Sequence, residues 1–269
     1  MPAITWPKYE VFALRYGTMQ QRPGRDIFLV TADAHDGPMP MDYFVWLIRG
    51  NGRQYLVDTG FNAQAALARK RTFLRCPIEA LQALGVKRDH VTDVIVTHMH
   101  YDHAGNIELL PRTRLHLQES EMHYSVGRHM NFTPLRHAYA VEDVTQVVRR
   151  LYQDEVVFHQ GDERLAPGIE LLHVGGHTMG LQAVRVHTAR GWVVLASDAT
   201  HYYANIDNES PFPVVHDVGA MLAGYRKLLA HAESPHHLVP GHDPLVRARY
   251  PHWGDSNGEI VALHLEPSQ

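Results

Sequence analysis

Short apolar and β-branched runs alternate with amphipathic stretches along the whole chain. Runs typical of strands cover residues 11–16, 43–49, 54–58, 93–97, 114–117, 155–158, 169–174, 181–188, 192–197, 237–239 and 260–264. Helical periodicity covers residues 63–70, 77–84, 119–128, 141–152 and 218–232. Residues 127–139 mix His, Met, Phe and Pro without a period, which predicts a loop or lid bordering a binding site.

The order of these elements predicts the fold class. The chain begins with several predicted strands, continues with helices and further strands, and ends with a helix and a last strand. This order, in two halves, favours an α/β sandwich with sheets inside and helices outside. No internal repeat or long linker interrupts the pattern. A length of 269 residues suits one large domain or two small ones, and we expect a single domain over residues 1–269.

Composition and charge narrow the range of partners. Apolar residues make up 45% and charged residues 20%, as in ordinary globular proteins, and the formal net charge is −4. A chain without a basic stripe cannot neutralise a run of phosphates, so we expect a small-molecule substrate and no nucleic acid. The one basic cluster, Arg69-Lys70-Arg71, is predicted to lie on a solvated helix face.

Cysteine content and hydropathy bear on the compartment. Cys76 is the single cysteine, which excludes an intrachain disulfide and a Cys-rich zinc site. The first residues lack a secretory pattern, and no run approaches the roughly 18 apolar residues of a membrane span. We expect a cytoplasmic protein without membrane contact, as a monomer or homodimer.

Metal-ligand residue types follow four of the predicted strands. His98, His100, Asp102 and His103 come directly after one strand, and the chain holds 21 histidines in all. His177 follows a Gly-Gly turn after a second strand, Asp198 ends a third, and His242 follows Pro-Gly after a fourth. Because glycine turns permit tight bends, each strand end can deliver its ligand to one edge of the sandwich. Imidazole and carboxylate groups in this number are enough for two metal ions.

The ordered motifs Thr-His-x-His-x-Asp-His, Gly-Gly-His-Thr, Ser-Asp and Pro-Gly-His resemble those of the metallo-β-lactamase superfamily. Asp58-Thr59-Gly60 matches its early strand-loop signature, and the resemblance covers residues 43 to 242. It implies an αββα sandwich of two mixed β-sheets flanked by helices. It also implies a dinuclear site for two divalent ions, Zn in the first place with Fe, Mn or Co as alternatives. The implied ligands are His98, His100 and His177 for one metal, Asp102, His103 and His242 for the other, with Asp198 bridging both and Asp58 orienting a ligand imidazole.

A bridging acid at Asp198 resembles the hydrolase branches of this superfamily more than its β-lactamases. The short segment after His242 argues against glyoxalase II, and the charge balance argues against RNase Z. What remains is most similar to the quorum-quenching N-acyl homoserine lactonases and to enzymes that open other small lactones. Their chemistry implies attack by a metal-bridging hydroxide, with Asp102 as proton carrier. Several of these lactonases place Tyr three residues after the bridging Asp. Here that position is His201, so His201, Tyr202 or Tyr203 is the candidate group at the substrate carbonyl.

The substrate pocket is predicted from apolar residues near the motifs. The loop of residues 33–41 is expected to overhang the metals, and the candidate wall residues are Met39, Met41, Phe61, Tyr101, Met130, Phe132 and Tyr203. A metallohydrolase for thioesters, cyclic amides or aryl esters is the main alternative function. A phosphodiesterase and a non-catalytic metal-binding module are the others.

Overall fold

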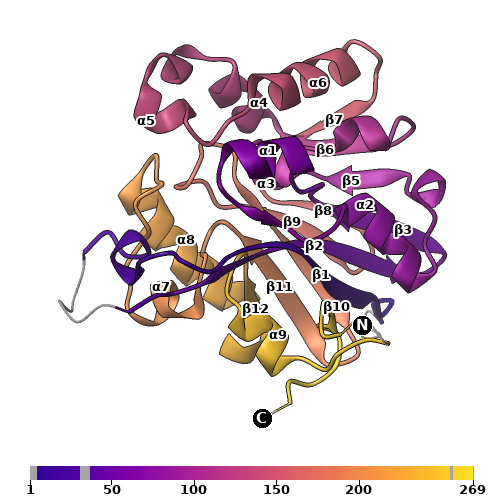
Figure 1. Cartoon of the computed structure of the whole chain (residues 1–269). Helices are drawn as coiled ribbons and strands as arrows, with labels where there is room; N and C mark the ends of the chain where they lie inside the picture. The colour runs from indigo at the N-terminus through magenta and orange to yellow at the C-terminus, as the bar shows by residue number, and fades with distance from the viewer. Residues whose placement is uncertain (1–4, 31–36, 255–256, 269) are drawn as a thin grey trace.

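Two β-sheets face each other, with helices on the outer side of each. This architecture is seen in the computed structural model, which describes residues 5–30, 37–254 and 257–268 (Figure 1). The predicted αββα sandwich with two mixed sheets is therefore confirmed.

The larger sheet combines an antiparallel and a parallel half. Its strand order is β13 (Ile260–Ala262), β1 (Glu10–Met19), β2 (Met41–Gly50), β3 (Arg53–Val57), β5 (Asp93–Ile95), β6 (Arg114–Gln118) and β7 (Val156–His159), and β4 (Thr72–Phe73) pairs with β1. The strands from β13 to β3 pair antiparallel, whereas β3, β5, β6 and β7 are parallel.

The smaller sheet faces it and is antiparallel except at one edge. Its order is β12 (Leu238–Pro240), β11 (Gly191–Ser197), β10 (Gln182–Thr188), β9 (Ile169–His173) and β8 (Glu163–Ala166). Only the pairing of β11 with β12 within this sheet is parallel.

The outer layers are helical. Helices α1 (Ala63–Ala68), α2 (Pro77–Ala80), α4 (Glu119–Ser125) and α6 (Val141–Leu151) contribute to the core on the outer face of the larger sheet, and α8 (Val218–His231) packs on the smaller one (Figure 1). Short helices are α3 (Tyr101–Ala104), α5 (Thr133–Arg136), α7 (Tyr203–Asp207) and α9 (Leu245–Arg249). Single 3₁₀ turns span Gly24–Asp26, Leu81–Leu84, Arg88–His90, Ile107–Leu109, Arg128–Asn131 and Pro235–His237.

Side-chain alternation explains why the strands are buried on both faces. In β2, Val45 and Leu47 pack under the helices, while the intervening Trp46 packs between the sheets. In β11, Leu195 joins the core between the sheets and Val194 faces α8. Because successive side chains point to opposite faces, such strands must be apolar at nearly every position, as their sequences are.

Several elements differ from the sequence-based prediction. Strands β4 and β8 were not predicted, since a two-residue strand has no period and β8 begins with the exposed pair Glu163-Arg164. Residues 127–139, predicted as a loop, contain the 3₁₀ turn Arg128–Asn131 and helix α5. The helix predicted over 63–70 ends at Ala68. No helix in the described ranges is long and apolar enough to cross a bilayer.

Candidate metal centre

The predicted ligands all lie at strand ends on one edge of the sandwich. His98 to His103 follow β5, His177 follows β9, Asp198 follows β11 and His242 follows β12. All of these side chains are buried. Burial is the main reason that the pKa values of His98, His100 and His177 are lowered, which keeps these imidazoles in the neutral form that binds metals.

Three imidazole nitrogens form the first group of ligand atoms. His98 Nε2 lies 3.0 Å from His100 Nδ1 and 3.2 Å from His177 Nε2, and the last two atoms are 2.9 Å apart. All three atoms lie close enough to share one ion.

A second group forms beside the first. Asp102 Oδ2 lies 3.8 Å from the Nε2 atoms of both His103 and His242. These three residues again offer atoms that could hold one ion.

The carboxylate of Asp198 lies between the two groups. Its Oδ1 is 3.3 Å from His103 Nε2 and 2.9 Å from His242 Nε2. Its Oδ2 is 3.4 Å from His177 Nε2 and 3.8 Å from His98 Nε2. One oxygen therefore faces each group, which is the arrangement expected of a bridging ligand.

The polar atoms of this cluster fit metal ions better than they fit one another. His103 Nε2 and Asp198 Oδ1 are buried without a hydrogen-bond partner among the described residues. Three neutral imidazoles cannot satisfy three facing nitrogens by hydrogen bonding alone. Nitrogens bound to a tetrahedral zinc ion at about 2.0–2.1 Å would lie about 3.3 Å apart, close to the spacing of the first group. The donor set thus suits two divalent cations.

Asp58 supports the second group from below. Its Oδ2 lies 2.7 Å from His103 Nδ1, and its Oδ1 and Oδ2 accept hydrogen bonds from the backbone N–H and the hydroxyl of Thr97. The Thr97 hydroxyl also contacts the Ser197 hydroxyl at 2.8 Å. Asp58 and Ser197 both have positive φ angles, 62° and 47°. The backbone therefore turns sharply after β3, where Asp58 lies, and at the end of β11, just before Asp198.

Glu121 is a second supporting carboxylate, and sequence reasoning did not single it out. It is fully buried on α4 and accepts four hydrogen bonds, from Met99 N, Tyr139 Oη, Thr178 Oγ1 and Gly180 N. It therefore ties the loop that carries His98 and His100 to the loop that carries His177. A Cβ atom on Gly180 would lie 2.1 Å from the backbone of Glu121, so only glycine permits this approach. Apolar and polar residues are mixed along α4, so the sequence does not indicate that this glutamate is buried.

His201 lies at the cluster, and its neighbours Tyr202 and Tyr203 point elsewhere. His201 Nε2 is 2.9 Å from Asp198 Oδ2, and its ring stacks on Phe212 at 3.4 Å between centroids. Tyr202 is buried in the core and donates to Pro40 O at 3.3 Å. Tyr203 packs in the core between the two sheets, and the guanidinium of Arg249 lies 3.9 Å from its ring centroid.

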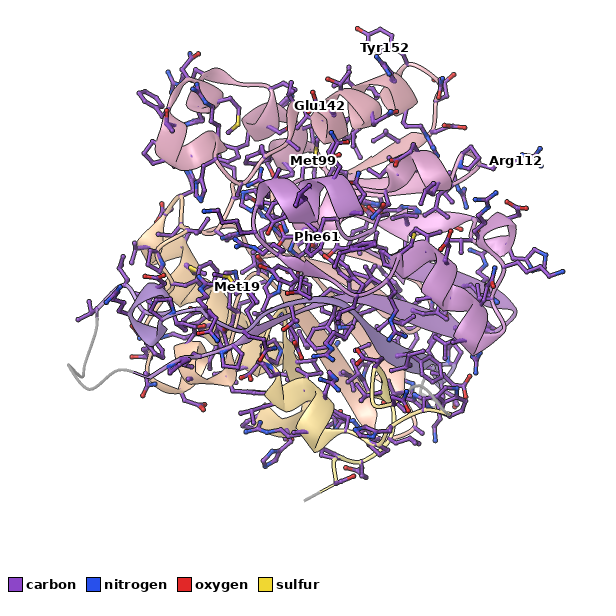
Figure 2. All side chains as sticks on the ribbon, viewed as in Figure 1. Met19, Phe61, Met99, Arg112, Glu142 and Tyr152 are labelled. Atoms are coloured by element: carbon purple, nitrogen blue, oxygen red, sulfur yellow. The ribbon has the colours of Figure 1, made fainter. Side chains whose placement is uncertain are left out.

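A cavity of about 250 Å³ opens onto the ligands. Of the predicted wall residues, Met41 and Tyr101 line it. Met39, Phe61 and Met130 pack in or against the core, and Phe132 is 59% exposed. Residues 33–36 of the predicted overhanging loop lie outside the described residues. Figure 2 labels Met19 and Phe61, of which Met19 reaches the cavity from the end of β1.

The cavity is more polar than the sequence predicted. Arg22, Arg69 and Arg71 line it together with Tyr43. The prediction that Arg69 and Arg71 lie on a solvated helix face is wrong, because α1 ends at Ala68 and Lys70 turns the chain with a φ of 55°. That turn leaves Lys70 exposed and directs Arg71 to the cavity.

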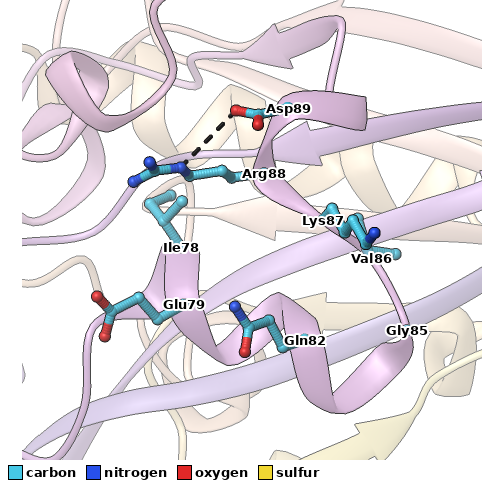
Figure 3. A pocket seen from close by; sticks show the side chains of 8 residues that line it. All are labelled: Ile78, Glu79, Gln82, Gly85, Val86, Lys87, Arg88 and Asp89. Carbon is cyan, nitrogen blue, oxygen red and sulfur yellow. Dashed lines mark ion pairs between the residues drawn. The ribbon is translucent and has the colours of Figure 1, made fainter.

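A second hollow, of about 700 Å³, lies beside α2 (Figure 3). Its Arg88 and Asp89 pair with each other at 3.7 Å and are 58% and 77% exposed. None of the predicted ligands lines it. Predicted ligands line the cavity of about 250 Å³ instead.

Known sequences match the chain over much of its length. The family model described as the metallo-beta-lactamase superfamily matches residues 39–255. An N-acyl homoserine lactonase from Bacillus sp is 28% identical over 136 residues, 50% of this chain and 49% of that protein. The N-acyl homoserine lactonase AiiB from Agrobacterium fabrum is 31% identical over 163 residues, 57% of this chain and 55% of that protein. The chain thus spans about half the length of these curated relatives.

Solved structures match the fold more completely. An N-acyl homoserine lactone hydrolase with the product N-hexanoyl-L-homoserine bound at its catalytic metal centre superposes with a TM-score of 0.73. The match covers 91% of this chain and 96% of that one at 20% sequence identity. The dizinc quorum-quenching lactonase AidC matches with a TM-score of 0.67 and 18% identity, over 90% of both chains.

Proposed function

The chain belongs to the metallo-β-lactamase superfamily, and from this premise we propose that it is a metal-dependent hydrolase that opens the ring of a small lactone. The observation that supports the proposal most is the carboxylate of Asp198, whose two oxygens face two separate groups of ligand atoms. The sequence relatives are N-acyl homoserine lactonases, which makes lactones the first substrates to test.

Two divalent ions held by these side chains, Zn or else Fe, Mn or Co, would supply a hydroxide at neutral pH and polarise the lactone carbonyl. The side chain of Asp102 lines the cavity and lies between His103 and His242. We assign to its carboxylate the task of accepting the proton that remains on the attacking hydroxide and passing it to the leaving alkoxide oxygen.

His201 suits a positioning role better than contact with the carbonyl. A carboxylate only accepts, so the 2.9 Å contact requires that His201 Nε2–H donates to Asp198. In the neutral ring Nδ1 is then an acceptor and has no proton to offer a carbonyl oxygen. His201 would hold Asp198 in its orientation between the two groups.

Tyr43 is the better candidate for the donor at the carbonyl. It lines the cavity, and its ring lies edge-on to His242 at 5.0 Å. Burial raises the pKa of Tyr43 to about 12, so the hydroxyl remains protonated at neutral pH and can donate. We propose this role for Tyr43 in place of Tyr202, which lies in the core.

A substrate panel tests the proposal. The metal-loaded protein is incubated with acyl homoserine lactones and aromatic lactones, and acid release is followed with a pH indicator. Thioesters, cyclic amides, aryl esters and bis-p-nitrophenyl phosphate serve as comparison substrates. Ring opening of a lactone with the highest kcat/KM supports the proposal. Turnover of another class alone would replace it.

Asp102→Asn tests the proton carrier. We expect kcat to fall by about 10²–10⁴-fold, the usual contribution of a general acid–base group, while much of the metal is retained. Asp26→Asn, another carboxylate at the cavity but outside the ligand groups, is the matched control. Near-full activity of Asp102→Asn with metal bound would remove Asp102 from this role.

A further inference from the structure

Three arginines line the cavity that opens onto the ligand cluster. Arg22 comes from the segment after β1, and Arg69 and Arg71 come from the end of α1. Most of the described residues around this cavity of about 250 Å³ carry charged or ionisable side chains. Pockets for neutral ligands are lined mainly by apolar side chains, so this lining suits a small and charged molecule.

Arg69 forms hydrogen bonds with the backbone that borders the cavity. Its Nη1 donates to His137 O at 2.8 Å and its Nη2 to Tyr139 O at 3.1 Å. Its guanidinium also lies 4.0 Å from the ring centroid of Tyr101. These contacts fasten the end of the 127–139 segment beside the cavity, so Arg69 has a structural role in the cavity wall.

Arg71 and Arg22 retain donors. Arg71 donates from Nε to Tyr101 Oη at 3.1 Å and from Nη1 to Arg69 O at 2.9 Å. Arg22 donates to Asp26 O at 3.0 Å and to the sulfur of Met41, a weak acceptor, at 3.0 Å. A guanidinium has five N–H groups, so both residues keep unused ones. Neither forms an ion pair with a carboxylate of the described residues.

Both guanidinium groups line the same cavity as the ligand cluster. Arg22 contacts Met41 and Arg71 contacts Tyr101, and both of these partners also line that cavity. Tyr43, which lines it too, packs against His242. The two positive charges therefore face the cavity onto which the ligand cluster opens.

None of the three described carboxylates at the cavity forms an ion pair with Arg22 or Arg71. Asp102 and Asp198 are directed at the histidines, and Asp26 is exposed. Holding half-buried guanidinium groups without a carboxylate partner is unfavourable for stability alone. A ligand with an anionic group would pair with these guanidinium groups. A carboxylate matches best, because the planar arginine side chain can donate two parallel hydrogen bonds to it.

We propose that Arg22 and Arg71 form an anion subsite, so that the substrate is a lactone bearing a carboxylate apart from its ring ester. The inference rests on the proposed lactone hydrolysis and adds the substrate class. The subsite contributes two guanidinium forks on the cavity that Tyr43 also lines, and it selects against neutral lactones of the same size.

Two isosteric probes test the subsite. N-succinyl-homoserine lactone ends in a carboxylate, and N-succinamoyl-homoserine lactone ends in a neutral amide of the same shape. We expect the metal-loaded protein to open the acid with a kcat/KM about tenfold or more above that of the amide. Arg71→Gln and Arg22→Gln should each reduce this ratio about tenfold, whereas Lys70→Gln, which removes an adjacent exposed charge, should leave it unchanged.

A binding readout separates this inference from the proposed function. The dissociation constants of the two ring-opened products are measured by calorimetry on the same proteins. Both products share the new carboxylate and differ only at the remote group. If the acid product binds more tightly than the amide product, and Arg71→Gln removes this difference, the subsite is supported. That holds even if neither lactone is opened. Failure to open either lactone would overturn the proposed lactone hydrolysis and not the subsite.

The opposite outcomes are equally distinct. Equal kcat/KM values for acid and amide, with both rings opened, would overturn the subsite and leave the hydrolase proposal intact. A variant that lowers turnover of both probes by the same factor would also overturn it, because the arginines would then serve only the new carboxylate or the wall of the cavity.

Discussion

The substitution Glu121→Gln tests how the two ligand loops are held together. Glu121 Oε1 accepts from Met99 N at 2.9 Å and from Tyr139 Oη at 2.8 Å. Its Oε2 accepts from Thr178 Oγ1 at 2.6 Å and from Gly180 N at 3.1 Å. A glutamine has one acceptor oxygen, so its NH₂ group must replace one of these two oxygens.

The cost follows from which donors can adapt. A hydroxyl can rotate and accept from the new NH₂, but a backbone N–H cannot. Either amide orientation therefore leaves one buried N–H, of Met99 or of Gly180, facing another donor. An unsatisfied buried donor costs about 1–3 kcal/mol. For a chain of this size we expect the Tm to fall by about 2–4 °C for each kcal/mol.

The assay is thermal and denaturant unfolding of the metal-free and the metal-loaded protein, together with a chelator competition for metal affinity. We expect lower stability in both states and weaker metal binding, because the loops that carry His98, His100 and His177 are joined through Glu121. Glu119→Gln is the control, since that side chain lies on the same helix and contacts Gln160 at the surface. Unchanged stability and unchanged metal affinity would show that Glu121 does not hold the two loops together.

Three further substitutions test the Asp58–His103 contact, the close backbone approach at Gly176 and the Asp93–His116 contact. Asp58→Asn should weaken metal binding about 10–100-fold in a chelator competition, because it loosens His103. Gly176→Ala should lower the Tm, since a Cβ there would lie 2.6 Å from Met221 Cα and the φ of 84° disfavours alanine. Burial would raise the pKa of Asp93, but its contact with His116 contributes to lowering it to about 2. Asp93→Asn should therefore destabilise the protein near neutral pH, and acid titration should show this difference vanishing as the pH falls from about 4 to about 2.

The fold and the positions of the candidate ligands could be predicted because both leave local signals. Apolar alternation marks the strands, and a ligand residue directly after a strand, as at Asp198, needs no knowledge of distant contacts. The sandwich then brings strand ends together by its topology. The two-residue strand β4 and the four-residue helix α3 leave no such period and were not predicted.

The rest of the site depends on contacts between distant segments. The burial of Glu121 is set by a glycine far along the chain, and the orientation of Arg71 is set by the turn at Lys70. Sequence proximity also misled the interpretation of Tyr203, which follows the ligand loop but packs under Arg249. Of the methionines and phenylalanines predicted for the wall, Met41 alone lines the cavity, beside Arg22, Arg69 and Arg71.

The two ligand groups joined by Asp198 are expected to hold the metals that support lactone ring opening. The most direct measurement follows metal content and the rate of ring opening in the same samples while metal-free protein is reloaded with Zn, Mn or Co. We expect no ring opening without metal and a rate that rises until about two ions are bound per chain. Ring opening by the metal-free protein, or an inactive protein with both ions bound, would contradict this expectation.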